Sequence, residues 1–180
     1  EMCIRDSEYF DLYLVHFPIA LKYVDFADRY PPEWLYDPSA AEPRMARDAV
    51  PLSDTWGGME GLVEQGLARQ IGVCNYNTGL LHDLMSYARI RPAMLQIESH
   101  PYLTQEALIR TAQDYGMAVT AFSPLGASSY LELDMATQQE SVLGERVIAD
   151  IAQEYGVSVA QVVLRWGLQR NTAVIPKTSK

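Results

Sequence analysis

Residues 70–123 decide the fold, and they read QIGVCNYNTGLLHDLMSYARIRPAMLQIESHPYLTQEALIRTAQDYGMAVTAFS. Three short apolar runs, Gln70–Asn75, Met94–Glu98 and Ala118–Ser123, alternate here with two amphipathic helical patterns. Strands that are apolar along their whole length are covered on both faces, as in a parallel sheet. Equivalent strand positions 71, 94 and 118 are separated by 23 and 24 residues. This short, regular repeat favours a closed (β/α) barrel over a doubly wound open sheet.

The alternation of strands and helices continues on both sides of this stretch. Two further apolar runs, Tyr9–His16 and Thr172–Lys177, bring the number of expected strands to five. We expect Thr78, Thr104 and Ser158 to cap three of the helices, because a hydroxyl group at a helix start accepts a hydrogen bond from a free backbone N–H.

Five strands are too few to close a barrel, which needs eight strands in about 250 residues. The sequence therefore predicts an α/β protein of the (β/α)8 TIM-barrel class, as a fragment that contains about strands 4 to 8. Such a fragment would lack about three N-terminal βα units and at least one C-terminal helix. Residues 1–7, EMCIRDS, show no strand or helix periodicity, so we interpret them as a non-native leader and residues 8–180 as a partial barrel domain.

The segment Ile19–Leu52 interrupts the regular repeat between the first strand and its helix. It is rich in Pro, Tyr, Trp and Asp, and long irregular loops in compact domains are usually functional or disordered. We expect an ordered flap over a pocket, formed with Tyr30, Trp34 and Tyr36. A mobile surface loop is the alternative.

Composition excludes several classes of protein. The chain has 14 Lys and Arg against 23 Asp and Glu, a net charge of −9, which disfavours nucleic acid or an anionic membrane as a partner. No apolar run approaches the roughly 20 residues of a membrane span, and no signal peptide opens the chain. Cys3 and Cys74 form neither a disulfide framework nor a metal-binding spacing. We therefore expect a cytoplasmic protein without a metal ion.

Polar or aromatic residues follow every expected strand, where barrel enzymes place their active sites. His16 is the candidate for chemistry, because a neutral imidazole donates a hydrogen bond to a carbonyl oxygen or transfers a proton. Asn75 and Gln96 offer donor and acceptor groups that suit an amide such as a nicotinamide carboxamide. The loops Ser123–Gly126 and Lys177–Lys180 resemble a phosphate site. The sequence has no Gly-x-Gly-x-x-Gly, so a dinucleotide would not be bound in the Rossmann manner.

Five motifs resemble the aldo-keto reductases in order and spacing, over residues 8–180. They are LVHFP (Leu14–Pro18), IGVCN (Ile71–Asn75), LQIESHPY (Leu95–Tyr102), AFSPLG (Ala121–Gly126) and IPKTS (Ile175–Ser179). Within this family, HFPIALKYVD followed by RYPPEW is most similar to the D-xylose (aldose) reductases, and the stretch RWGLQRNTAVIPKTSK is also similar to plant aldose-6-phosphate reductases. The resemblance implies NAD(P)H-dependent reduction of the aldehyde of an aldose to an alditol, with an aldose 6-phosphate as the alternative substrate.

The resemblance also implies roles for single residues. His16 matches the histidine that orients the substrate carbonyl, and Phe17 lies beside it as a substrate contact. The cofactor would be NADPH, with NADH as a second option. The implied cofactor contacts are Cys74, Asn75 and Gln96 at the carboxamide, Phe122 on the nicotinamide ring, Ser123, Leu125 and Gly126 at the pyrophosphate, and Glu132, Lys177, Thr178 and Ser179 at the adenosine ribose and its 2′-phosphate. Cys74 stands where serine is common, and a thiol is a weak donor.

The family's catalytic aspartate, tyrosine and lysine belong to strands that come before Tyr9, and this chain has no match to them. An arginine expected shortly after Lys180 is also missing. We therefore expect the 180-residue fragment to be inactive, and the whole protein to act as a monomer or homodimer on a small aldose or aldehyde. Two alternatives stay open: a non-catalytic NADP(H)-binding barrel subunit, and an unrelated phosphate-binding barrel such as an aldolase or isomerase, for which Glu98 would be the carboxylate.

Overall fold

The computed structural model describes residues 8–30, 34–126 and 141–177. The expected leader at residues 1–7 lies outside the described residues. So do three of the expected cofactor contacts, Glu132, Thr178 and Ser179.

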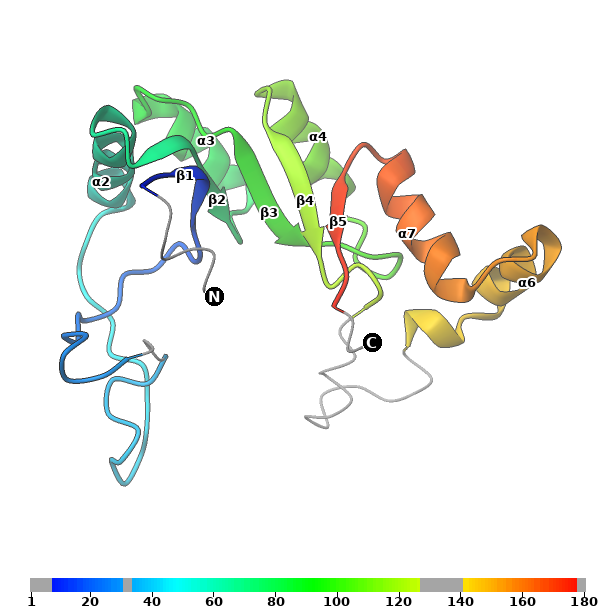
Figure 1. Ribbon diagram of the computed structural model, residues 1–180, viewed down its shortest axis with the longest axis horizontal. Coiled ribbons are helices and arrows are strands. Elements are labelled where there is room, and N and C mark those ends of the chain that lie inside the picture. Colours follow the sequence, from blue (N-terminus) through cyan, green and yellow to red (C-terminus); the bar gives the residue numbers. More distant parts are fainter. Residues whose placement is uncertain (1–7, 31–33, 127–140, 178–180) are drawn as a thin grey trace.

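Five strands form one sheet in which every neighbouring pair is parallel. They are β1 (Phe10–Val15), β2 (Ala68–Cys74), β3 (Met94–Glu98), β4 (Ala118–Phe122) and β5 (Ala173–Ile175). Their order in the sheet is β1-β2-β3-β4-β5, so each strand lies beside its predecessor in the sequence. A doubly wound sheet would reverse its strand order at a switch point. The uniform order is that of a barrel wall, and Figure 1 shows the sheet curving accordingly.

Helices connect the strands and lie along the convex side of this curved sheet. They are α2 (Leu52–Glu64), α3 (Thr78–Tyr87), α4 (Glu106–Asp114), α6 (Arg146–Tyr155) and α7 (Val159–Gln169), with a short 3-10 helix η2 (Val142–Gly144) before α6. Figure 1 shows α2, α3, α4 and α7 against the sheet, whereas α6 extends away from it beyond α7.

The hydrophobic core lies between the sheet and the helices. In β3, Leu95 and Ile97 are buried on the helix side, while Met94, Gln96 and Glu98 are half-buried on the opposite, inner face. This alternation follows from the two-residue period of a strand. The helix side of β2 and β4 and the facing helix residues complete the core, with Ile71, Val73, Val119, Trp56, Leu81, Leu84, Ile109 and Ala112 among its members.

Two of the helix starts show how local chemistry positions the helices. The expected cap at Ser158 is confirmed: its side chain accepts a hydrogen bond from the backbone N–H of Gln161, and the Gln161 side chain accepts one from the backbone of Ser158. The expected cap at Thr78 is wrong by one residue. Asn77 is the cap, because its Oδ1 accepts the backbone N–H of Leu80 at 2.9 Å.

The expected cap of α4 at Thr104 is also wrong. Gln105 occupies the cap position in the left-handed conformation, with a φ of 52°, and makes no capping hydrogen bond through its side chain. Thr104 instead presents its carbonyl oxygen to the guanidinium of Arg170 at 2.8 Å. A contact between segments 66 residues apart thus lies at this helix start.

A buried carboxylate joins α2 to the segment that enters β3. Oε1 of Glu60 accepts the backbone N–H groups of Arg89 at 2.7 Å and Ile90 at 2.9 Å, and Oε2 lies 2.8 Å from the Arg89 guanidinium. Nε1 of Trp56 donates to the carbonyl oxygen of Ile90 at 3.1 Å. Burial alone would raise the pKa of Glu60, but the hydrogen bonds from Ile90 and Arg89 and the charge of Arg89 outweigh it, and the net effect lowers the pKa.

In the described ranges, no single helix is both long enough and apolar enough to cross a membrane. α6 and α7 meet that criterion only when they are joined, and their axes are bent by 96°. The same residues contain no group of three His, Cys, Asp or Glu side chains that could hold a metal ion.

Candidate active site

The carboxyl ends of the five strands meet at one edge of the sheet, which Figure 1 shows below the strands. Cys74 pairs with Gln96, and Glu98 pairs with Phe122, which in turn pairs with Ile175. Residues that pair across parallel strands share a face and a height, so these side chains belong to two adjacent layers of the inner face. The structure thus brings the expected strand-end residues to one rim.

His16 lies one residue beyond β1, exposed at this rim. Its ring centroid is 5.7 Å from that of Phe17 and 5.3 Å from that of Trp34, and the Phe17 and Trp34 rings meet nearly edge to face at 88°. Trp34 comes from the segment between β1 and α2, so this segment contacts His16. Tyr30 and Tyr36 instead contact other members of the same segment.

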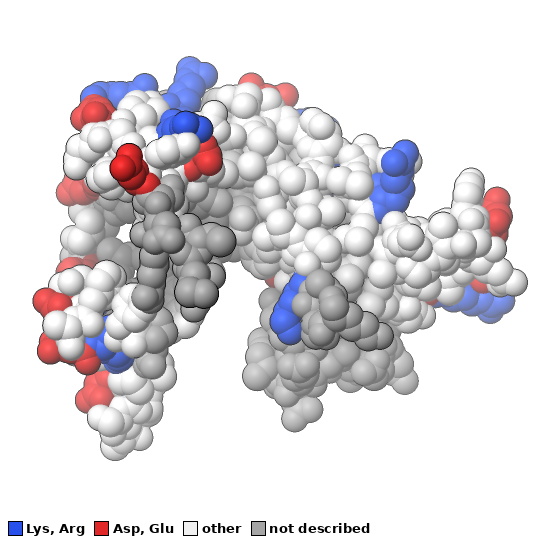
Figure 2. All heavy atoms as spheres, viewed as in Figure 1, with Lys and Arg blue, Asp and Glu red and all other residues white. Residues whose placement is uncertain are grey.

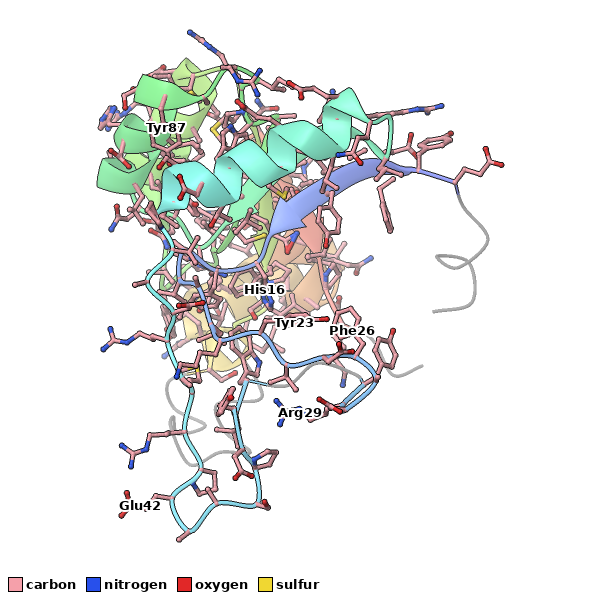
Figure 3. The ribbon with its side chains drawn as sticks, turned by 90° about the vertical axis from the view of Figure 1, so that its left-hand side faces the viewer. His16, Tyr23, Phe26, Arg29, Glu42 and Tyr87 are labelled. Atoms are coloured by element: carbon pink, nitrogen blue, oxygen red, sulfur yellow. The ribbon has the colours of Figure 1, made fainter. Side chains whose placement is uncertain are left out.

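The segment Ile19–Leu52, here called the flap segment, has two arms, residues 20–22 and 46–48, that pair through their backbones. Leu21 and Arg47 form an antiparallel bridge, flanked by hydrogen bonds from Lys22 N to Ala46 O and from Asp48 N to Ala20 O, both of 2.9 Å. The arms and Trp34 enclose a cavity of about 250 Å³ that is lined by Leu21, Lys22, Tyr23, Val24, Phe26, Arg29, Trp34, Tyr36 and Ala46. Figure 3 shows the flap segment beneath His16 and labels Tyr23, Phe26 and Arg29 on it.

Asn75 follows β2 directly and connects three strand ends. Its φ is 61°, in the left-handed region. Its backbone N–H donates to the carbonyl oxygen of Gln96 at 3.0 Å. Its side-chain Nδ2 donates to the carbonyl oxygen of His16 at 2.8 Å. The contact between Asn75 and His16 joins residues 59 apart in the sequence, and the sequence analysis missed it.

Cys74 and Gln96 lie side by side on the inner face of the sheet. Cys74 is buried, and burial raises the pKa of its thiol to about 11. Thr120 pairs with Gln96 in the next strand, and its hydroxyl donates to the sulfur of Met94 at 3.1 Å. The sequence analysis missed Thr120 as a polar member of this face. Its position two residues before Phe122 is the signal that could have found it, because alternate strand residues share a face.

The loop after β4 forms a tight turn. Ser123 has a φ of 47°, Gly126 has a φ of 74°, and the Gly126 N–H donates to the Ser123 carbonyl oxygen at 2.9 Å. A Cβ added to Gly126 would come within 3.1 Å of Val142, so both its conformation and its surroundings favour glycine. Phe122 and Leu125 are half-buried at this turn. The Gly126 N–H is engaged within the turn, so the close backbone approach is the feature that Gly126 offers a ligand.

Two charged residues complete the rim. Lys177 lies two residues beyond β5 and is exposed. Glu98, at the end of β3, is mostly buried, and its Oε1 lies 3.3 Å from Nε2 of the mostly buried His100. The Glu98 carbonyl oxygen accepts a hydrogen bond from the Gln105 side chain at 3.3 Å. Glu98 and His100 thus form a pair beside the rim.

Figure 2 shows the molecule hollowed below the arch that the sheet and its helices form, on the side of the strand ends. The strand ends on this side carry an imidazole, two side-chain amides, an aromatic ring and a lysine, from His16, Asn75, Gln96, Phe122 and Lys177. Amides bind a planar carboxamide, an aromatic ring stacks on a flat heterocycle, and an imidazole polarises a carbonyl group. The arrangement suits a nucleotide cofactor that lies along the rim with a carbonyl compound beside His16.

Comparisons with known proteins identify relatives of the whole chain. Residues 5–180 match the model of the aldo/keto reductase family. Probable NAD(P)H-dependent D-xylose reductases from Neosartorya fischeri and Aspergillus fumigatus are each 54% identical over 174 residues, which are 96% of this chain and 53% and 54% of those proteins. An NAD(P)H-dependent D-xylose reductase from Pyricularia oryzae is 49% identical over 175 residues, 53% of its length. The chain therefore spans about half the length of the curated relatives it matches.

Solved structures agree with this result. Aldose reductase from Giardia lamblia superposes with a TM-score of 0.80 at 39% identity, over 99% of this chain and 55% of that one. Aldose reductase from Schistosoma japonicum gives 0.79 at 34% identity, over 96% and 50%. An aldo-keto reductase from Bombyx mori, in complex with NADP, gives 0.75 at 33%, over 96% and 49%.

Sequence, sheet topology and relatives thus lead to one result. The singly wound parallel sheet is part of a (β/α)8 barrel, which confirms the fold class expected from the strand repeat. The match to the family model covers nearly every residue, including all five strand ends. The chain belongs to the aldo/keto reductase family.

Proposed function

We propose that this chain is part of an NAD(P)H-dependent aldose reductase that converts an open-chain aldose, D-xylose first, into its alditol. The single observation that supports this most directly is the meeting of His16, Asn75 and Gln96 at one edge of the sheet. Relatives named D-xylose reductases, at about half identity, favour a neutral aldose over a phosphorylated one. In the reaction, a hydride adds to the aldehyde carbon and a proton adds to its oxygen.

The residues at the rim fit a nicotinamide cofactor. Asn75 and Gln96 place two half-buried amides at neighbouring strand ends, and the half-buried ring of Phe122 lies one strand further along. These groups would hold the carboxamide and stack on the ring. Ser123, Leu125 and Gly126 would hold the pyrophosphate, and Lys177 would be the cation at the 2′-phosphate of the adenosine ribose. NADPH, or NADH as the second option, supplies the hydride when bound. Within the proposal, Glu132, Thr178 and Ser179 stay assigned to the adenosine end, and Cys74 to the carboxamide end.

His16 would act on the substrate. A neutral imidazole donates a hydrogen bond to the aldehyde oxygen and stabilises the negative charge that develops there. Phe17 and Trp34 flank the His16 ring, so they would shield this hydrogen bond from water and contact the carbon chain of the sugar. The proton donor of the family has no match in this chain, so we propose that the 180-residue chain alone is inactive.

The test uses the full-length protein that contains this chain. With xylose and NADPH, the variant His16→Ala should lose roughly 10²- to 10³-fold in kcat/KM, the range typical of a positioned acid–base or hydrogen-bonding group, while the Kd for NADPH stays close to that of the wild type. His82→Ala is the matched control, because His82 is exposed on α3 and its ring contacts Tyr115. Unchanged turnover by His16→Ala, or xylose-dependent NADPH oxidation by the 180-residue chain alone, would contradict the proposal.

The remaining expectations belong to the same proposal. We propose residues 1–7 as a non-native leader and 8–180 as a partial barrel domain. We propose a cytoplasmic enzyme. The net charge of −9 favours a small aldose or aldehyde as its partner over nucleic acid or a membrane. A monomer or homodimer is the proposed assembly. A substrate panel of xylose and glucose 6-phosphate tests the alternative of an aldose-6-phosphate reductase.

A further inference from the structure

The main-chain position of His16 depends on a side chain from another strand. The paired register of β1 and β2 ends at Val15 and Val73, so His16 lies beyond the backbone ladder. Its carbonyl oxygen accepts a hydrogen bond from Nδ2 of Asn75 at 2.8 Å instead. Pro18, two residues further, has no N–H, so it cannot close a three-residue turn onto this oxygen. In the described part of the chain, this bond is the polar tie between the His16 backbone and the rest of the sheet.

Asparagine meets two requirements at position 75 that few residues meet together. The φ of 61° is tolerated by Gly, Asn and Asp and disfavours most other side chains. The bond to His16 requires a side-chain donor, which Gly and Asp lack. An asparagine amide has two N–H groups and an acceptor oxygen. One N–H is engaged with His16, so a second N–H and the oxygen remain for a carboxamide.

We infer that Asn75 is a positioning residue for His16, in addition to the cofactor contact that the proposed function gives it. The same side chain touches the backbone of the substrate-orienting histidine and the place of the nicotinamide, so it couples the two. Ordering of Asn75 by the cofactor fixes His16, and by reciprocity a well-placed His16 strengthens cofactor binding. The catalytic consequence rests on the proposed function, but the hydrogen bond itself does not.

The experiment compares Asn75→Asp with two other variants of the full-length protein. Asn75→Asp keeps the shape and the backbone conformation but removes the donor. We expect its kcat at saturating NADPH to fall about tenfold, the effect of losing one hydrogen bond at the reacting centre. Gln96→Ala, which removes the other amide proposed to hold the carboxamide, should weaken NADPH binding. Asn171→Asp is the matched control, because Asn171 also has a positive φ, 59°, but precedes β5 at the opposite end of the strands.

A second readout is independent of activity. With histidine labelled by ¹³C at the carbonyl carbon, the His16 signal should shift in Asn75→Asp without any cofactor, and stay in place in Asn171→Asp. If wild-type protein fails to reduce xylose, the proposed function fails while this signal still decides the hydrogen bond. An unshifted His16 signal, or an Asn75→Asp variant that changes only the Kd for NADPH, would overturn the inference. Asn75→Gly, which keeps the backbone and lacks the donor, gives the same readouts if the aspartate variant does not fold.

Discussion

Replacing Glu60 with glutamine should lower the free energy of unfolding by about 2 kcal/mol at pH 7. Both backbone N–H groups that Glu60 accepts bind the same oxygen, Oε1, at 2.7 and 2.9 Å. Glutamine keeps an oxygen there, so both bonds remain but lose their charge assistance. Its NH₂ group replaces Oε2 and faces the Arg89 guanidinium, a donor against a donor. The ion pair itself adds little, because two thirds of the Arg89 side chain is exposed.

The pH dependence of this effect has a definite sign. The pKa of Glu60 in the folded chain is lower than its ordinary value of 4.5. The carboxylate therefore contributes stability above the pKa of the unfolded chain, and the contribution disappears as the pH falls through the folded pKa. The difference in stability between wild type and Glu60→Gln should be constant from pH 6 to 8 and shrink below pH 4.5.

Urea unfolding followed by tryptophan fluorescence measures the loss of stability and its pH dependence, because buried Trp56 donates to Ile90 at the same junction. Glu64→Gln is the control: Glu64 bonds the same Arg89 at 3.0 Å but is half exposed, and its loss should cost less than about 0.5 kcal/mol. Equal destabilisation by both variants would refute the reasoning. So would a loss of unfolding free energy in Glu60→Gln that is as large at pH 3 as at pH 7.

Three further predictions concern other parts of the molecule. In the full-length protein, Lys177→Ala should weaken NADPH more than NADH in fluorescence titrations, because the proposed function makes Lys177 a charge partner of the 2′-phosphate; equal losses would contradict this. Burial raises the pKa of Cys74 to about 11, so iodoacetamide should label it slowly at neutral pH and rapidly in urea, and fast labelling of Cys74 in the folded protein, measured on its own peptide, would disprove it. Gly72→Ala should lower Tm strongly, because its Cβ would lie 2.4 Å from the Met94 carbonyl oxygen; Gly58→Ala, whose Cβ meets nothing within 4 Å, is its control.

Strand positions were predictable from the apolar runs, and their ends were not. Met94–Glu98 was expected and is β3 as observed. β2 begins two residues before its expected start: Ala68 pairs with Phe10 of β1, and Arg69 stacks its guanidinium 4.0 Å from the Tyr9 ring and pairs with Asp11 at 2.7 Å. Those partners come from β1 and the residue before it, so no local pattern shows them.

The candidate site was predictable as a set of residues but not as a geometry. Parallel strands bring their carboxyl ends together, so a polar residue after each apolar run indicates a shared rim. The bond from Asn75 to His16 and the packing of Trp34 on His16 connect residues far apart in sequence. The register of the sheet brings Asn75 to His16, and the path of the flap segment brings Trp34 to His16. Neither can be read from the local sequence.

Backbone conformation at the rim separates site positions from ordinary helix ends. Among the described residues, four that are not glycine have a positive φ: Asn75, Gln105, Ser123 and Asn171. Asn171 lies after α7, where a helix C-terminus commonly adopts such an angle, and Gln105 lies at the start of α4. Asn75 and Ser123 lie directly after β2 and β4 and cap no helix. The left-handed turn at these two positions ends the strand and redirects the chain across the rim, and its cost of about 1 kcal/mol or more persists only where surrounding contacts enforce it. At Asn75 those contacts are the Gln96 and His16 carbonyl oxygens, so the strained residue is held by the same groups that it positions.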